Sequence, residues 1–117
     1  MTVKHFVSAA DFAAFQGKVV HKVCSTYVLA REIEWSSRQF VLKMREDDEE
    51  GVGTMLTIEH KSPAFEGEEI NIEATVESLV GNELICTYKV TVGDRLIAHG
   101  KTGQKVLKRS KLAQIFS

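Results

Sequence analysis

The fold is decided by the stretch STYVLAREIEWSSRQFVLKM at residues 25–44, which contains neither Gly nor Pro. Ser25 is a residue type that commonly caps helices, so the stretch predicts a helix from Ser25 to Met44, about five turns long. Its apolar residues spread over more than half of the helix surface, which predicts a helix wrapped by a sheet. Thr26 and Glu34 therefore become candidates for burial, and a buried carboxylate is often functional.

The sequence after this helix changes to an alternation of apolar and polar residues. The alternation is clearest where Ile70, Ile72 and Ala74 are separated by polar residues. A period of two is typical of strands with one buried face. We expect strands at 54–60, 70–76, 84–92 and 95–107, with hairpin turns at 80–83 and 93–94. Short connections predict an antiparallel sheet with one helix on one face, an α+β fold.

The remaining segments carry weaker signals. We expect a short strand at 3–7 and a brief helical piece that begins after Ser8 and stops at Gly17. Residues 18–24 lead into the main helix. The acidic run at 46–50 opposes the helix dipole, so we expect a solvated loop there, without chemistry. A short helix is expected within residues 108–117.

Composition narrows the functional classes. The 117 residues predict one domain at 1–117, large enough for a core but too small to cover every sheet edge, so association is expected. A net charge of -1 argues against nucleic acid as a partner. Cys24 and Cys86 are expected to be unpaired core residues of a reducing compartment. Neither a leader nor a membrane-spanning apolar run is visible, which favours a cytoplasmic protein without a membrane partner.

His60 has the strand parity of Leu56 and Ile58, so its imidazole is expected on the helix side of the sheet. Glu34 on the helix and Thr26 at its start are the groups that it can meet. Each residue alone has an ordinary explanation as a packing, ion-pair or capping group. Together, a hydroxyl, a carboxylate and an imidazole form a constellation used in acyl transfer and hydrolysis.

At these residues the sequence resembles the hotdog-fold thioesterases, most closely the fluoroacetyl-coenzyme A thioesterase branch. The likeness lies in the joint spacing of Ser25-Thr26, Glu34-Trp35 and the segment from Gly53-Thr54 to His60. The resemblance implies the hotdog fold, an antiparallel sheet wrapped around one long central helix. It also implies a thioester hydrolase that needs neither metal nor cofactor, since coenzyme A is part of the substrate.

The same resemblance implies site residues. The matching catalytic residues are Thr26, Glu34 and His60, and the substrate-binding positions are Ser25, Gly53 and Thr54. Aromatic lid residues of the fluoroacetyl branch fall at Gly17 and Val20, and an arginine of its last strand falls at Gln104. These departures give no reason to expect a fluorinated acyl group.

Other hotdog patterns fit less well. A catalytic Asp before the central helix is disfavoured because no acidic residue lies between Asp11 and Glu32. Asp94 and His99 have the spacing used by hydratases of this fold, but Asp94 falls in a turn and His99 has the parity of Arg95, so we treat this match as accidental.

Helix geometry sets a constraint on the candidate site. Thr26 and Glu34 lie roughly 12 Å apart along one straight helix, so they cannot hydrogen-bond to each other. Either the substrate spans this gap, or Thr26 of one subunit approaches Glu34 and His60 of another. The resemblance implies dimers with sites at the interface, so we expect a homodimer, with a higher oligomer left open.

The expected function is hydrolysis of an acyl-CoA or related thioester. Glu34 or His60 would act as general base, and Thr26 as nucleophile or hydrogen-bond donor. Amides of the helix N-terminus and of the Gly53 region would bind the oxyanion. Two alternatives stay open: a non-catalytic binder of acyl thioesters or other small ligands, and a purely structural dimer.

Overall fold

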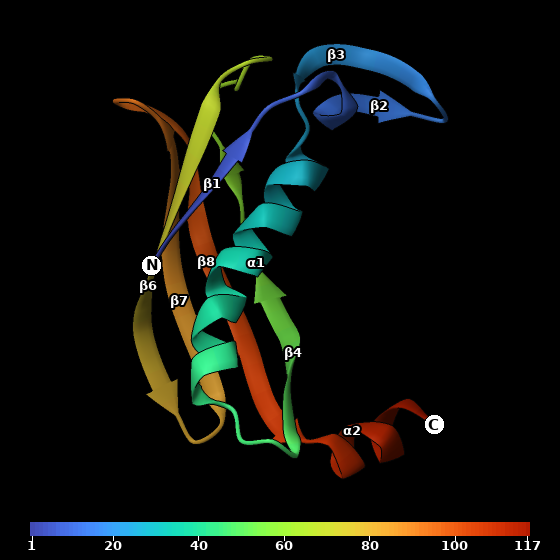
Figure 1. The fold of residues 1–117 in the computed structure, drawn as a ribbon, viewed down its shortest axis with the longest axis vertical. Coiled ribbons are helices and arrows are strands. Elements are labelled where there is room, and N and C mark those ends of the chain that lie inside the picture. The colour runs from blue at the N-terminus through green and yellow to red at the C-terminus, as the bar shows by residue number, and fades with distance from the viewer.

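Helix α1 (Thr26–Met44) packs against a curled antiparallel sheet in the computed structural model, which describes residues 1–117 (Figure 1). Ser25 caps the helix, because its Oγ accepts a hydrogen bond from the Val28 amide at 3.0 Å. The predicted helix is therefore confirmed, with Ser25 as its cap. No helix of the chain is both long and apolar enough to cross a membrane.

The main sheet has six strands in the order β1-β6-β7-β8-β4, with β5 paired to β8, and all pairs are antiparallel. Its two long hairpins turn at Gly81 and Gly93, both at positive φ, which confirms the predicted turns. The strands are β1 (Thr2–Phe6), β2 (Phe12–Phe15), β3 (Lys18–Cys24), β4 (Glu49–Leu56), β5 (Glu59–His60), β6 (Glu69–Val80), β7 (Glu83–Val92) and β8 (Arg95–Lys108), and the short helices are η1 (Ala9–Asp11) and α2 (Arg109–Phe116).

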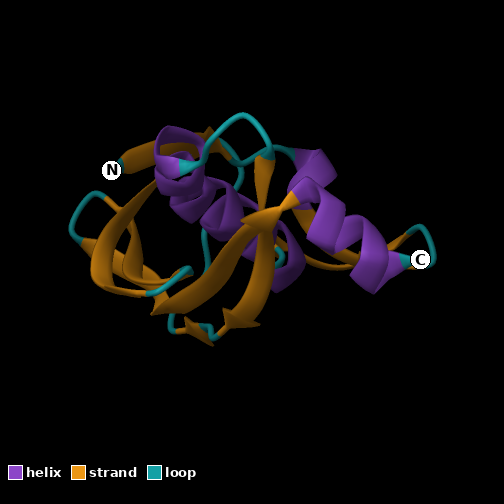
Figure 2. Cartoon of the chain, turned by 90° about the horizontal axis from the view of Figure 1, so that it is seen from below, coloured by secondary structure: helices purple, strands orange, loops and turns teal.

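The core lies between α1 and the sheet, which curves around the helix in Figure 2. Leu29 and Ile33 of the helix are fully buried against Ile70, Ile72 and Val90 of the sheet. Burying side chains of this size stabilises the fold by about 1.5–3 kcal/mol each. Both cysteines are buried and unpaired, as predicted.

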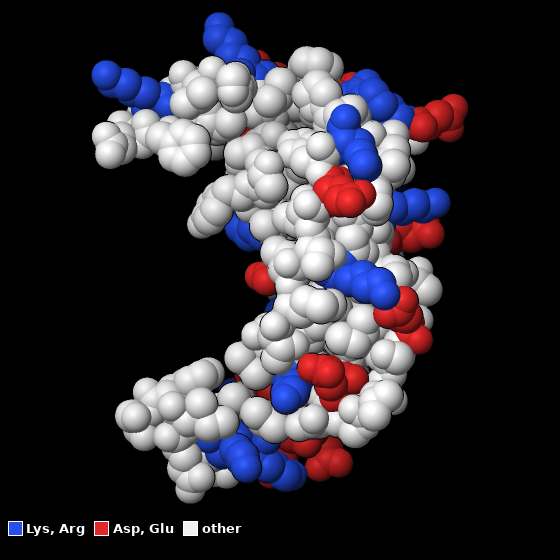
Figure 3. All heavy atoms as spheres, turned by 180° about the vertical axis from the view of Figure 1, so that it is seen from behind, with Lys and Arg blue, Asp and Glu red and all other residues white.

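The segment before α1 differs from its prediction. Only Ala9–Asp11 is helical, and the chain then forms a separate two-stranded hairpin of β2 and β3. Its turn residues, Gln16 and Gly17, have φ of 53° and 79°, the conformation that a tight hairpin needs. The valines of β3 favour a strand in this segment, which leads into the helix as expected. This hairpin, α1 with β4, and α2 surround a hollowed side of the molecule (Figures 1 and 3).

Two further predictions are corrected around β4. The acidic run is not a free loop, since β4 begins at Glu49, and Glu50 forms ion pairs with Arg38 and Arg45. The strand predicted at 54–60 breaks at 57–58, so that β4 and β5 are separate segments along β8. The predicted C-terminal helix is confirmed as α2.

The break between β4 and β5 is held by contacts with β7 and β8. The Tyr88 hydroxyl donates to the Thr57 carbonyl at 2.6 Å, and the Lys101 amide donates to Thr57 Oγ1 at 2.9 Å. Burial raises the pKa of Tyr88 to about 12, so its hydroxyl stays protonated as a donor. A Cβ at Gly100 would overlap the Thr57 carbonyl. Only a glycine therefore fits at this point of β8, where residues 57–58, which join β4 to β5, lie against the strand. The position of residues 57–58 fixes the position of His60, because β5 follows them directly.

We therefore expect Gly100→Ala to lower the free energy of unfolding by about 2 kcal/mol, because the added methyl group pushes Thr57 and the segment between β4 and β5 away from β8. Urea unfolding curves measure the change. The matched control is Gly53→Ala, whose Cβ would meet nothing closer than 3.8 Å and which should change stability by less than about 0.5 kcal/mol. Equal stability of both variants would contradict the role assigned to Gly100.

Candidate functional site

Thr26 and His60 form a hydroxyl–imidazole pair at the start of α1. Thr26 is the first residue of the helix and His60 ends β5, and the distance from Thr26 Oγ1 to His60 Nδ1 is 3.0 Å. This contact confirms that His60 points to the helix side of the sheet. The distance lies within the range of a nucleophile and its general base.

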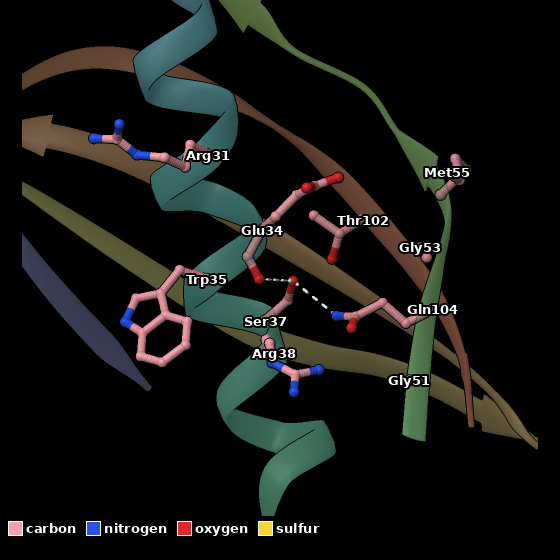
Figure 4. Close-up of a pocket in the computed structure, with 11 residues that line it drawn as sticks. Arg31, Glu34, Trp35, Ser37, Arg38, Gly51, Gly53, Met55, Thr102 and Gln104 are labelled. Atoms are coloured by element: carbon pink, nitrogen blue, oxygen red, sulfur yellow. Dashed lines mark hydrogen bonds between the residues drawn. The ribbon is translucent and has the colours of Figure 1, made fainter. Parts of the chain in front are cut away.

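Glu34 lies apart from this pair, in a cavity of about 280 Å³ between α1 and strands β4 and β8 (Figure 4). Its carboxylate points away from the helix and across the cavity, and Oε1 would lie 3.8 Å from a Cβ at Gly53. Glu34 therefore faces the backbone of β4 closely. The cavity is lined by Arg31, Glu34, Trp35, Ser37, Arg38, Gly51, Gly53, Met55, Thr102, Gly103 and Gln104.

The predicted burial of Thr26 and Glu34 is wrong for the single chain. Both residues are exposed, because the sheet covers only one side of α1. The outer side carries a stripe of uncovered residues, among them Tyr27 at 78% and Trp35 at 48% exposure. This side of the helix therefore presents large aromatic side chains that the chain itself does not cover.

The predicted pairing across subunits is also corrected. One of the two arrangements expected from the sequence placed His60 beside Glu34 and opposite Thr26 of another subunit, whereas one chain already joins His60 to Thr26. The reason lies in β4, where an irregularity between Gly53 and Met55 and the break at 57–58 turn the chain toward the start of α1. Glu34 is left without either proposed partner within hydrogen-bond distance.

The predicted substrate-binding residues fall in different places. Ser25 lines a second, mostly apolar cavity of about 630 Å³ between the start of α1 and the β2–β3 hairpin, together with Thr26. Gly53 lines the Glu34 cavity instead, and Thr54 is exposed at the irregularity of β4. Within one chain, the helix N-terminus and the Gly53 region therefore do not share a cavity as one oxyanion site.

The polar residues that line the Glu34 cavity were missed as a group by sequence reasoning. Ser37 Oγ accepts from Gln104 Nε2 at 3.0 Å and donates to the Glu34 carbonyl at 3.2 Å. Thr102 is 2% exposed, and its hydroxyl has no nitrogen or oxygen partner within hydrogen-bond distance. The available signal was the parity of Thr102 and Gln104, which share the helix-facing side of β8 with Val106.

A curled antiparallel sheet around one long helix is the architecture of the hotdog fold. A hypothetical protein of Thermus thermophilus, described as a thioesterase superfamily member, shares 26% identity with a TM-score of 0.93, and 98% of this chain and 85% of that chain are covered. A mutant of the fluoroacetyl-CoA-specific thioesterase FlK in complex with fluoroacetate and CoA has 17% identity and a TM-score of 0.89, with 99% and 95% covered.

A hot-dog-like protein from Thermanaerovibrio acidaminovorans likewise matches with a TM-score of 0.90 at 17% identity, covering 99% of this chain and 86% of that chain. At 17% identity, such likeness shows the fold alone. No curated protein sequence matches the chain. The family model described as FlK, fluoroacetyl-CoA-specific thioesterase, matches residues 7–110, and the chain belongs to this family. The family is one of thioester hydrolases.

Glu50 binds Arg38, one of the residues that line the Glu34 cavity. Its two carboxylate oxygens each accept from Arg38 at 3.1 Å, and Arg45 adds a third contact at 2.6 Å. These arginine hydrogen bonds, together with the Gly51 amide, lower the pKa of Glu50 to about 2. Arg38 is thereby fixed in position on the cavity wall.

The lowered pKa makes a prediction for acid stability. The ionised Glu50 stabilises the fold fully above its ordinary pKa of 4.5, and this contribution is lost as the pH falls toward 2. We expect Glu50→Gln to be less stable than wild type at pH 7, and the difference to close between about pH 4.5 and 2. Urea midpoints at several pH values measure it. Glu66→Gln removes an exposed carboxylate without an ion pair and should leave the pH profile unchanged.

Proposed function

We propose that the protein hydrolyses an acyl-CoA or a related thioester and that Thr26, His60 and Glu34 carry out the reaction. The observation that carries the proposal is the 3.0 Å contact of Thr26 Oγ1 with His60 Nδ1, in a chain of the thioesterase family. The CoA-bound FlK complex, which shares the fold, supports a coenzyme A thioester as the substrate class.

The site is proposed to be composite, with Thr26 and His60 from one subunit of a homodimer and Glu34 from the other. Residues 26 and 34 are symmetric about Ala30, so two antiparallel α1 helices that cross at Ala30 bring Thr26 opposite the partner's Glu34. The uncovered stripe with Tyr27 and Trp35 supports this packing, since it offers an apolar surface to a second helix. Two equivalent sites per dimer follow from the symmetry.

In the proposed reaction, neutral His60 takes the proton of Thr26 as the Thr26 oxygen attacks the thioester carbon. The carbon–sulfur bond then breaks, and the proton passes from His60 to the departing thiolate. The partner's Glu34 removes a proton from a water molecule, which attacks the acyl ester and releases the carboxylic acid. The proton that Glu34 took from water passes to the departing Thr26 oxygen, so Thr26 and Glu34 return to their starting states and the cycle consumes one water per thioester.

An acyl-thioester binder without turnover is the second candidate function, because a fold does not determine a reaction. Such a protein would bind the thioester in the same cavities without hydrolysing it. Ligand-dependent thermal stabilisation in the absence of any turnover would favour it.

A panel of acyl-CoA substrates with a thiol reagent tests the proposed activity. We expect turnover in wild type, and a decrease in kcat/KM of about 10²–10⁴-fold in His60→Ala and in Glu34→Ala, because each loses a proton-transfer group. His99→Ala is the matched control, since His99 pairs with Glu59 on the exposed side and should retain activity. Full activity of the two site variants would contradict the assignment.

The covalent step is tested by the intact mass of a slow variant. Glu34→Gln should accumulate a species heavier than the chain by one acyl group, because the acyl ester forms but water is not activated. The species should be absent from the double variant that also carries Thr26→Val. Turnover of Glu34→Gln without any such species would contradict the role of Thr26 as nucleophile.

A further inference from the structure

One buried polar group on the wall of the Glu34 cavity lacks a nitrogen or oxygen partner for a hydrogen bond. Thr102 lines this cavity and is 2% exposed, and its hydroxyl has no nitrogen or oxygen partner within hydrogen-bond distance. The residue opposite it on β7 is Cys86; burial raises the pKa of this thiol, and a weak hydrogen bond from the Thr102 hydroxyl partly offsets the rise. A buried hydroxyl whose one neighbour is a weakly accepting thiol costs free energy, so its presence beside a cavity points to a stronger partner that occupies the cavity.

Gln104 offers a second free polar atom to the same cavity. The only proton of the Ser37 hydroxyl is donated to the Glu34 carbonyl, so Ser37 Oγ can only accept from Gln104. The amide nitrogen of Gln104 therefore faces Ser37 (Figure 4), and its Oε1, which makes no hydrogen bond within the chain, lies on the cavity wall next to Gly51. Oε1 can only accept.

Thr102 and Gln104 present these atoms side by side. They are two residues apart on β8, so both side chains lie on the helix-facing side of the sheet, about 6.6 Å apart along the strand. One offers a hydroxyl that donates or accepts, and the other an oxygen that only accepts. Their complement is a group that can both donate and accept, which is the property of a hydroxyl.

The charges around the cavity favour a neutral group. Glu34 repels a carboxylate on the acyl chain and Arg31 repels an ammonium, while the charge of Arg38 is already balanced by Glu50. A hydroxyl carries neither charge. The volume of about 280 Å³ lies just below the usual range of ligand pockets, about 300–1,000 Å³, and suits a short acyl chain.

We propose that the preferred substrate is a thioester of a short acyl chain that carries a hydroxyl group, bound by Thr102 and Gln104. This inference rests on the proposed function, because it assigns the acyl group of the same site. Apolar acyl chains of equal size leave both polar atoms unpaired and are therefore poorer substrates.

Isosteric substrate pairs test the proposal. Hydroxyacetyl-CoA is compared with propionyl-CoA, and 3-hydroxypropionyl-CoA with butyryl-CoA. In wild type, kcat/KM should favour the hydroxyl member of one pair by about tenfold or more, the effect of one neutral hydrogen bond. Thr102→Val should bring this ratio to about one, while Thr102→Ser should keep it. Thr75→Val, on the exposed side of β6, is the matched control and should also keep it.

The outcomes separate the two proposals. Turnover that favours the apolar member of both pairs, or a ratio unchanged in Thr102→Val, overturns the hydroxyl assignment and leaves thioester hydrolysis standing. Absence of turnover with every substrate overturns the proposed function, and the assignment with it. Thermal unfolding checks that each variant is folded; if Thr102→Val is not, Gln104→Met replaces it with the same expected loss of the ratio.

Discussion

The packing of α1 against the curled sheet is the contact on which the rest of the structure depends. Leu29 and Ile33 place one side of the helix in the core, and this fixes the opposite side outward. The same rigid helix then carries Thr26 at its start and Glu34 about 12 Å further along. One hydrophobic contact thus sets both the fold and the separation of the candidate catalytic groups.

Local signals predicted the main elements well. The helix could be predicted within a residue, because Ser25 is a strong cap and no Gly or Pro interrupts the run to Met44. The long strands followed from alternation and from glycine turns such as Gly81. The β2–β3 hairpin was missed because its turn begins with Gln16, a residue that rarely takes a positive φ.

The site could be predicted only in part. His60 was placed on the correct side of the sheet by strand parity, but its contact with Thr26 depends on the break at 57–58, which Tyr88 and Gly100 hold from other strands. No local pattern carries that information. The exposure of Glu34 was likewise missed, because a helix sequence does not tell whether a sheet or a second subunit covers its outer side.

The separation of Glu34 from the Thr26–His60 pair makes a composite site the central claim, and mixed dimers test it most directly. If His60 and Glu34 of one site come from different subunits, a dimer of Glu34→Ala with His60→Ala has one intact site. Random mixing of the two inactive variants should then restore about a quarter of wild-type activity. If both residues act within one subunit, every site in the mixture carries a defect, and activity that stays at the level of the separate variants would contradict the account.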